Sequence, residues 1–284
     1  MMRRAVSLLF GLLVCLQAHA QPKEATPKDV IVIGGALAEI VYALSAEHRL
    51  AGTDTTAIYP LAARETPKVG YQRSLSAEGI LSLKPKIIIA ASEAGPKAAL
   101  DQIREAGVSI ELFPAQHTAS QVIENIGRIA KILEIPKQGA ALQTKLRREL
   151  DQMRDTVSGL GGRKPKVLFL LAHGSTPQVS GNGTAAHAMI ELAGGENAIN
   201  SFTGYRPLTA EGAIAAAPDV ILISEQGLEA QGGIEGLLKR PGLALTPAGQ
   251  SKRIVKMDAL QLMGFGPRLA QTAVLLATQL RASP

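Results

Sequence analysis

The sequence is poor in cysteine and aromatic residues: its 284 residues include one Cys, no Trp, and only 3% Phe, Trp and Tyr together. The one cysteine, Cys15, lies in an N-terminal stretch that we expect to be removed, which leaves no disulfide and no thiol chemistry. A mature chain of roughly 260 residues can instead be stabilised by core packing alone. Sparse aromatics and scattered Lys and Arg also exclude the basic, stacking stripe of a nucleic-acid binder.

Enzyme and metal-site motifs are missing as well. Gly34-Gly35 follow the first apolar run, but no G-x-G-x-x-G, Walker loop or G-x-S-x-G is present. A zinc or manganese site would need about three His and a carboxylate, often with a His-rich loop. The mature histidines, in contrast, are dispersed along the chain: His48, His117, His173 and His187. We therefore expect a binding protein and not an enzyme.

Residues 1–20 have the pattern of a cleaved signal peptide, with Arg3 and Arg4 before an apolar stretch and an A-x-A site ending at Ala20. The apolar stretch is too short to span a bilayer, and Val14 before Cys15 disfavours lipoprotein processing. We expect a periplasmic protein. Without Arg3 and Arg4 the chain has 28 Lys+Arg against 24 Asp+Glu, a net charge of +4 that suits an anionic small ligand.

Strand and helix patterns alternate in two separate regions. Short β-branched runs such as Val30 to Ile33 and Val167 to Leu171 are each followed by helix-period apolar residues. This alternation predicts two three-layer α/β lobes with central parallel sheets, an N-terminal lobe at 29–117 and a C-terminal lobe at 165–284. Residues 118–160 show only helical spacing and predict a long connecting helical segment, interrupted near Pro136.

The two lobes contain similar segments. Residues 75–89 align with residues 208–222 at a constant offset of 133, with 6 of 15 positions identical, including Leu-[Ser/Thr]-Ala-Glu-Gly. Helix capping by Ser76 and Thr209 and helix termination by the prolines explain part of this likeness. They do not explain a repeated Glu-Gly, because Gly inside a helix costs about 0.8–1 kcal/mol relative to Ala. We interpret the lobes as duplicated.

These features together resemble the helical-backbone substrate-binding proteins of ABC importers, which carry metals, siderophores, cobalamin or haem. The stretch Val69-Gly-Tyr-Gln-Arg-Ser-Leu-Ser-Ala-Glu-Gly-Ile-Leu81 is similar to the periplasmic haem-binding proteins of Gram-negative haem uptake systems. The resemblance covers nearly the whole mature chain and implies that haem is the transported ligand. A ferric siderophore or cobalamin is the alternative ligand within the same class.

The resemblance implies that Tyr71 is the axial ligand of the haem iron. A phenolate oxygen suits ferric iron, and Arg73 could favour the phenolate or hold a haem propionate. The alternative for Tyr71 is a packed surface-loop residue. With the offset of 133, Arg206 corresponds to Arg73 across the cleft, whereas Tyr205 is displaced by one position from Tyr71 and is expected to be a wall or a hydrogen-bond partner.

Two further residues follow the first strand of the second lobe. The resemblance implies that His173 could ligate the iron of a second, stacked haem, and a hydrogen-bonded structural histidine is the alternative. Ser175 lies in a donor-rich loop that could hold a propionate or be a plain turn.

The repeated glutamates, Glu78 and Glu211, match the positions that dock into the membrane permease in this class. The alternative is a favourable interaction of each carboxylate with its helix N-terminus, worth about 0.3–1 kcal/mol. The implied partners are haem and an inner-membrane ABC permease with its ATPase, and we expect the protein itself to be a monomer.

Overall fold

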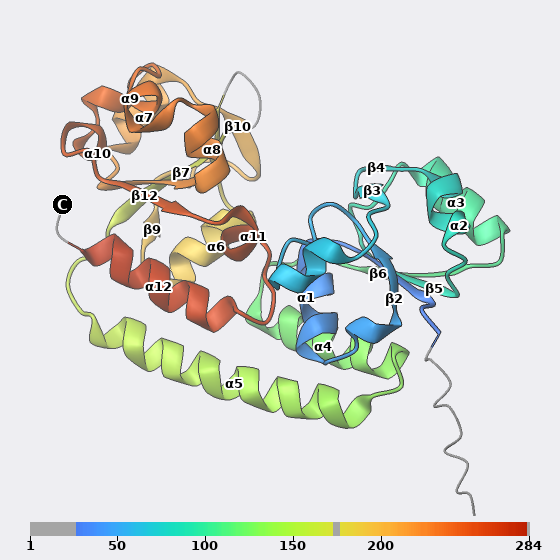
Figure 1. Ribbon diagram of the computed structural model, residues 1–284. Coiled ribbons are helices and arrows are strands. Elements are labelled where there is room, and N and C mark those ends of the chain that lie inside the picture. Colours follow the sequence, from blue (N-terminus) through green and yellow to red (C-terminus); the bar gives the residue numbers. More distant parts are fainter. Residues whose placement is uncertain (1–26, 173–176, 283–284) are drawn as a thin grey trace, which may run out of the picture.

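The computed structural model describes residues 27–172 and 177–282, which form two α/β lobes above a pair of long helices (Figure 1). The N-terminal lobe contains a sheet of order β2-β1-β5-β6 in which every pair is parallel. The four strands are β1 (Val30–Ile33), β2 (Leu50–Thr53), β5 (Ile87–Ala91) and β6 (Ser109–Phe113).

Helices cover both faces of this sheet, because its strands are apolar on both sides. One face packs on α1 (Gly35–Ala43) and α4 (Ala119–Ile132), while the other packs on α2 (Ala77–Ser82) and α3 (Lys97–Glu105). Alternate residues of β1 separate accordingly, with Val30 and Val32 in one core cluster and Ile31 and Ile33 in another. The predicted three-layer arrangement is confirmed for this lobe.

The C-terminal lobe has a mixed sheet of order β10-β8-β7-β11-β12. Its parallel part comprises β7 (Lys166–Leu171), β11 (Val220–Ser224), β12 (Ile254–Met257) and the short β9 (Glu196–Asn197), which also pairs with β7. Strands β8 (Gln178–Ser180) and β10 (Tyr205–Pro207) extend it in antiparallel fashion. The predicted central parallel sheet is confirmed, and strands β8 and β10 add an antiparallel edge that the sequence patterns did not indicate.

Helices again cover both faces of the second sheet. On one side lie α6 (Ala185–Leu192), α11 (Ala259–Met263) and α12 (Leu269–Arg281). On the other side are short elements: α7 (Ala210–Ala216), α8 (Glu225–Ala230), α9 (Gly233–Leu238), the 3-10 turn η3 (Leu243–Leu245) and α10 (Pro247–Gln250).

Two long helices join the lobes: α4 and α5 (Pro136–Gly159). Figure 1 shows α5 running beneath both lobes, and its buried face carries Leu146, Leu150 and Met153. Because Gly139 lacks a side chain, α4 can approach closely; an added Cβ would lie 2.3 Å from Cβ of Ala130. The hydrophobic cluster that contains α4, α5 and α12 includes strands of both sheets, so the two lobes share one core. No helix in the described part of the chain combines the length and apolarity needed to cross a membrane.

Candidate ligand site between the lobes

Tyr71 lies in a short hairpin formed by β3 (Gly70–Tyr71) and β4 (Ser74–Leu75). Gly70 has a φ of 100°, a conformation that favours glycine, and it starts the hairpin. The backbone of Gly95 accepts a hydrogen bond from the N–H of Leu75 and donates one to the carbonyl of Gln72, each at 2.9 Å. The Tyr71 side chain is 46% exposed, so a phenol is presented to solvent on an anchored piece of backbone.

Arg73 occupies the two-residue turn of this hairpin together with Gln72. Because the chain turns between Tyr71 and Ser74, the alternation of an extended strand does not fix on which side of the hairpin the Arg73 side chain lies. Arg73 is exposed and has no ion pair with any other described residue. Its guanidinium is therefore available to an anion near the hairpin.

Strand β10 places Tyr205 and Arg206 on opposite faces of the second sheet. The Tyr205 ring packs against Phe169, with the centroids 6.5 Å apart and the ring planes tilted by 60°. Arg206 is exposed, and its guanidinium carbon lies over the Phe202 ring at 4.5 Å from the centroid. Burial raises the pKa of Tyr205, partly offset by hydrogen bonds with Thr184 and the backbone of Ala186. A phenol that is harder to ionise is the poorer iron ligand, so the structure favours the wall role for Tyr205.

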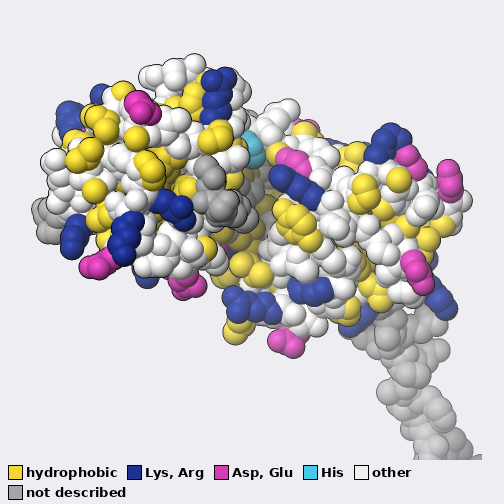
Figure 2. All heavy atoms as spheres, turned by 90° about the horizontal axis from the view of Figure 1, so that it is seen from above, with side chains coloured by type: hydrophobic (Ala, Val, Ile, Leu, Met, Phe, Trp, Pro, Cys, Tyr) yellow, Lys and Arg dark blue, Asp and Glu magenta, His cyan; other side chains and the backbone are white. Residues whose placement is uncertain are grey.

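Figure 1 shows the hairpin β3–β4 near the top of the N-terminal lobe and β10 on the side of the other lobe that faces it. From above, the molecular surface narrows between two rounded lobes, and Lys and Arg are dispersed over this face (Figure 2). Tyr71 and Arg73 belong to this hairpin and Arg206 belongs to β10, and all three residues are exposed. His173 and Ser175 lie outside the described residues.

The segment Ser180 to Thr184 is rich in hydrogen-bonding groups, and its hydroxyl groups are bonded within the protein. Ser180 and Thr184 are 0% and 4% exposed and are hydrogen-bonded to each other at 2.5 Å. Thr184 also caps α6 by accepting a hydrogen bond from the N–H of His187. These hydroxyls stabilise the fold and are not free for a ligand.

The backbone N–H groups of Gly34 and Gly35, in the turn after β1, are hydrogen-bonded to side chains of the protein itself. The buried carboxylate of Asp54 accepts the N–H of Gly34, and the hydroxyl of Thr56 accepts that of Gly35, each at 2.8 Å. An added Cβ on Gly35 would lie 2.4 Å from the carbonyl oxygen of Thr56. The N-terminus of α1 is therefore covered by the loop after β2, which explains the glycines without a phosphate ligand.

The repeated glutamates occupy equivalent places in the two lobes. Ser76 accepts the N–H of Gly79 at 3.3 Å and Thr209 accepts that of Gly212 at 3.0 Å, so the predicted helix caps are confirmed. Glu78 and Glu211 are exposed in the first turns of α2 and α7, and neither has an ion pair with another described residue. Both helices lie on the upper side of the molecule (Figure 1).

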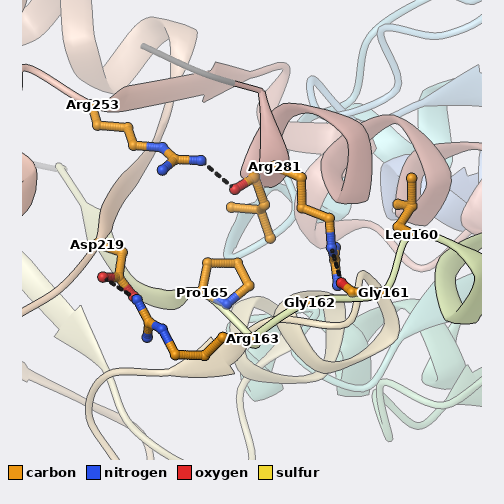
Figure 3. Close-up of a pocket in the computed structure, with 9 residues that line it drawn as sticks. Leu160, Gly161, Gly162, Arg163, Pro165, Asp219, Arg253 and Arg281 are labelled. Atoms are coloured by element: carbon orange, nitrogen blue, oxygen red, sulfur yellow. Dashed lines mark hydrogen bonds and ion pairs between the residues drawn. The ribbon is translucent and has the colours of Figure 1, made fainter.

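A cavity elsewhere in the described part of the protein is less suitable for an anionic ligand. A cavity of about 300 Å³ lies near the end of α5 and is lined by charged residues that include Arg163, Asp219, Arg253 and Arg281 (Figure 3). Its charged groups are already paired: Arg163 with Asp219 at 2.7 Å, and Arg253 with the carbonyl of Leu280 at 2.6 Å. Among the described residues no group of three or more His, Cys, Asp and Glu could hold a metal ion.

Sequence reasoning missed an ion pair that crosses between the lobes, Glu39 with Arg268. The two residues are 229 positions apart, and neither belongs to a motif. No local signal in a single sequence identifies such a pair.

The comparisons with known proteins agree with this architecture. The family model described as periplasmic binding protein matches residues 30–260. The chain is 48% identical to the periplasmic haem-binding protein BhuT in complex with two haems, with a TM-score of 0.86 and coverage of 89% of this chain and 97% of that one. It is 40% identical to the haem-binding protein RhuT from Roseiflexus sp. RS-1 in apo form, with a TM-score of 0.86 and coverage of 89% and 98%.

A more distant relative is the vitamin B12-binding protein of Photorhabdus laumondii, 26% identical over 77% of this chain and 78% of that protein. These matches confirm the predicted fold class, and they confirm the expectation of a binding protein and not an enzyme. The chain belongs to the periplasmic binding protein family.

Proposed function

We propose that this protein captures haem between its two lobes in the periplasm and delivers it to an ABC-type import permease. The observation that carries this proposal is the likeness to BhuT, which extends over 89% of the chain at 48% identity and whose structure contains two haems. Haem here is the cargo and not a resident cofactor.

Tyr71 is the proposed axial ligand of the haem iron. Tyr71 is 46% exposed on the anchored hairpin β3–β4, whereas Tyr205 of the other lobe packs on Phe169 and has a raised pKa. A phenolate oxygen is a suitable ligand for ferric iron. The proposal therefore assigns the iron to the N-terminal lobe and leaves Tyr205 as a wall residue.

Arg73 and Arg206 are the proposed partners of the haem propionates. Both are exposed, and neither has an ion pair with another described residue. Arg206 stacks on Phe202, which holds the guanidinium plane in a defined direction. His173 as the ligand of a second haem and Ser175 as a propionate partner remain proposals that rest on the sequence resemblance.

The second candidate function is binding of cobalamin or a ferric siderophore, which the vitamin B12-binding relatives favour. Equilibrium titration of the purified protein with haemin, cyanocobalamin and a ferric hydroxamate separates these possibilities. The proposal predicts a Soret band that saturates with haemin and no binding of the other two ligands. Saturation with cobalamin or the siderophore, without a haemin response, would replace haem as the cargo.

The same titration gives the number of haems. A single site saturates at one equivalent, whereas a stacked pair saturates at two. If the pair depends on His173, His173→Ala should return the stoichiometry to one while Tyr71 still binds the first haem. Two equivalents in both proteins would remove the role of His173.

We further propose that Glu78 and Glu211 dock the loaded protein on the permease, which works with its ATPase, and that the protein acts as a monomer after cleavage of residues 1–20. Both residues are exposed, in helices α2 and α7, which lie on the upper side of the molecule in Figure 1 and are already capped by Ser76 and Thr209. The variant Glu78→Lys/Glu211→Lys should bind haem normally but fail to transport it into permease-containing vesicles. Undiminished transport would refute the docking role.

A further inference from the structure

The Glu39–Arg268 ion pair joins helix α1 of the N-terminal lobe to the start of α12 in the other lobe. It is bidentate, with Nε to Oε1 and Nη2 to Oε2 both at 2.9 Å, and the side chains are 6% and 18% exposed for Glu39 and Arg268. Gly266 allows this approach, because an added Cβ would lie 3.3 Å from the carboxyl carbon of Glu39. The position of Arg268 relative to the N-terminal lobe is therefore closely defined.

The same guanidinium covers a tyrosine of the N-terminal lobe. The central carbon of Arg268 lies 3.5 Å from the centre of the Tyr59 ring. A planar guanidinium can bind a carboxylate through its edge and an aromatic ring through its face at the same time. Arg268 thus connects three elements: α1, α12 and the loop of residues 54–66. Figure 1 shows the segment leading into α12 alongside the N-terminal lobe.

The loop 54–66 is held firmly at other points. The amino group of Lys68 donates hydrogen bonds to the carbonyls of Ala57 at 2.9 Å and Ala63 at 2.7 Å. The N–H of Thr55 donates to the carbonyl of Gly70 at 2.9 Å, which ties the start of the loop to the hairpin that carries Tyr71. The loop is therefore ordered before any ligand arrives, and its exposed side chains have little conformational freedom left to lose.

Two large apolar side chains of this loop are exposed. Tyr59 is 42% and Leu61 is 71% exposed, and together with Tyr71 they are three of the large exposed hydrophobic residues of the N-terminal lobe. These exposed apolar side chains belong to a loop whose start is hydrogen-bonded to the hairpin that carries Tyr71. A bound apolar tetrapyrrole face that covered them would remove apolar area from water, which is favourable.

We propose that Tyr59 and Leu61 form an apolar contact surface for the haem macrocycle, and that Arg268 is a positioning residue that holds this surface in place from the opposite lobe. This inference rests on the proposed function, since it assumes that the cargo is haem. It adds to that function a contact surface that none of the proposed iron or propionate partners supplies. It also makes one part of the ligand surface dependent on the contact between the lobes.

The first test compares Leu61→Asp with Leu245→Asp by haemin titration. Leu245 is a matched control, since it is 65% exposed but lies in η3 of the other lobe. Burying a leucine contributes enough that placing a carboxylate there should raise the Kd at least about tenfold. The Leu245→Asp protein should bind like wild type. Equal Kd values for the two variants, with Tyr71→Ala still impaired, would overturn the contact surface but leave haem binding intact. A wild-type protein that does not bind haemin would instead overturn the proposed function.

The second test asks whether Arg268 acts through the loop. Arg268→Lys retains a cation for Glu39 but loses the plane that covers Tyr59. The Kd should rise, and the additional effect of Leu61→Asp should be clearly smaller in this background than in wild type, because the loop is no longer held. Thermal unfolding of each variant verifies the fold. If Arg268→Lys lowers the melting temperature but leaves both the Kd and the Leu61→Asp effect unchanged, its role is structural only and the positioning role is wrong.

Discussion

Removal of one partner of the Glu39–Arg268 pair should destabilise the whole protein. In Glu39→Ala the guanidinium of Arg268, which is 18% exposed in the intact pair, would lose its carboxylate partner. Burial disfavours the charge of Arg268, but the hydrogen bonds and charge of Glu39, with smaller contributions from Tyr59 and Asp258, raise the pKa of Arg268 above its ordinary value. Breaking a buried pair costs about 3–5 kcal/mol, and the residual exposure of Arg268 favours the lower end, about 3 kcal/mol.

The assay is thermal unfolding followed by circular dichroism, with the melting temperature Tm as the readout. One hydrophobic cluster includes strands of both sheets, so we expect a single transition. For a chain of this size 1 kcal/mol shifts Tm by roughly 2–4 °C, which predicts a decrease of about 6–12 °C for Glu39→Ala.

Glu149→Ala is the matched control. Glu149 also lies in a helix, and its oxygen is 3.9 Å from the Lys145 amino group in a pair whose lysine is 57% exposed. Surface pairs of this kind contribute about 0.3–0.5 kcal/mol to the free energy of unfolding. The Tm of Glu149→Ala should therefore differ from that of wild type by less than about 2 °C. A second variant, Glu39→Leu/Arg268→Met, removes both charges and should recover much of the loss. If Glu39→Ala behaves like Glu149→Ala, the pair is not the lobe contact that the geometry indicates.

Three further predictions concern single positions. Gly35→Ala would force the Thr56 carbonyl away and should lower the free energy of unfolding, measured by urea denaturation, by about 1–3 kcal/mol. An unchanged free energy of unfolding would mean that the loop carrying Thr56 moves without cost. Burial lowers the pKa of His117, opposed by Glu93, so the unfolded chain binds the proton more readily and stability should fall as pH decreases below about 6.5. His117→Leu should reduce that pH dependence between pH 7.5 and 5, and an unchanged dependence would assign it elsewhere. Thr209→Ala removes the cap of α7 and should lower the free energy of unfolding by about 0.5–2 kcal/mol. Equal urea midpoints for Thr209→Ala and wild type would contradict this prediction.

Much of the architecture could be predicted because it depends on local patterns. The buried run Val30 to Ile33 forms β1 as predicted, and the helical spacing through Met153 forms α4 and α5 with a break before Pro136. The caps at Ser76 and Thr209 are confirmed for the same reason, since a cap bond joins residues only three positions apart.

The antiparallel edge of the second sheet could not be predicted in this way. Strands β8 and β10 have three residues each, Gln-Val-Ser and Tyr-Arg-Pro, which are too short and too polar to show a period-two pattern. Their pairing is decided by tertiary contacts, such as Tyr205 packing on Phe169. The sequence offset that related Arg206 to Arg73 carries no information on this strand pairing.

The contacts between the lobes are the other part that sequence could not predict. Glu39 lies among the apolar positions of α1 and would ordinarily be assigned to solvent, yet it is 4% exposed because Arg268 reaches it from the other lobe. The Tyr59 ring is likewise covered by Arg268, a residue of the other lobe. Pairs of this kind depend on the packing of whole lobes and leave no local pattern.

The most direct test of the central claim is the absorption spectrum of haemin bound to wild type, Tyr71→Phe and Tyr205→Phe. Tyr71→Phe removes only the hydroxyl that would bind the iron, and Tyr205→Phe removes the equivalent oxygen from the phenol that packs on Phe169. We predict that wild type and Tyr205→Phe give the same high-spin ferric phenolate spectrum, and that Tyr71→Phe loses it together with most of the affinity. An unchanged spectrum in Tyr71→Phe would contradict the assignment of the iron to the hairpin β3–β4.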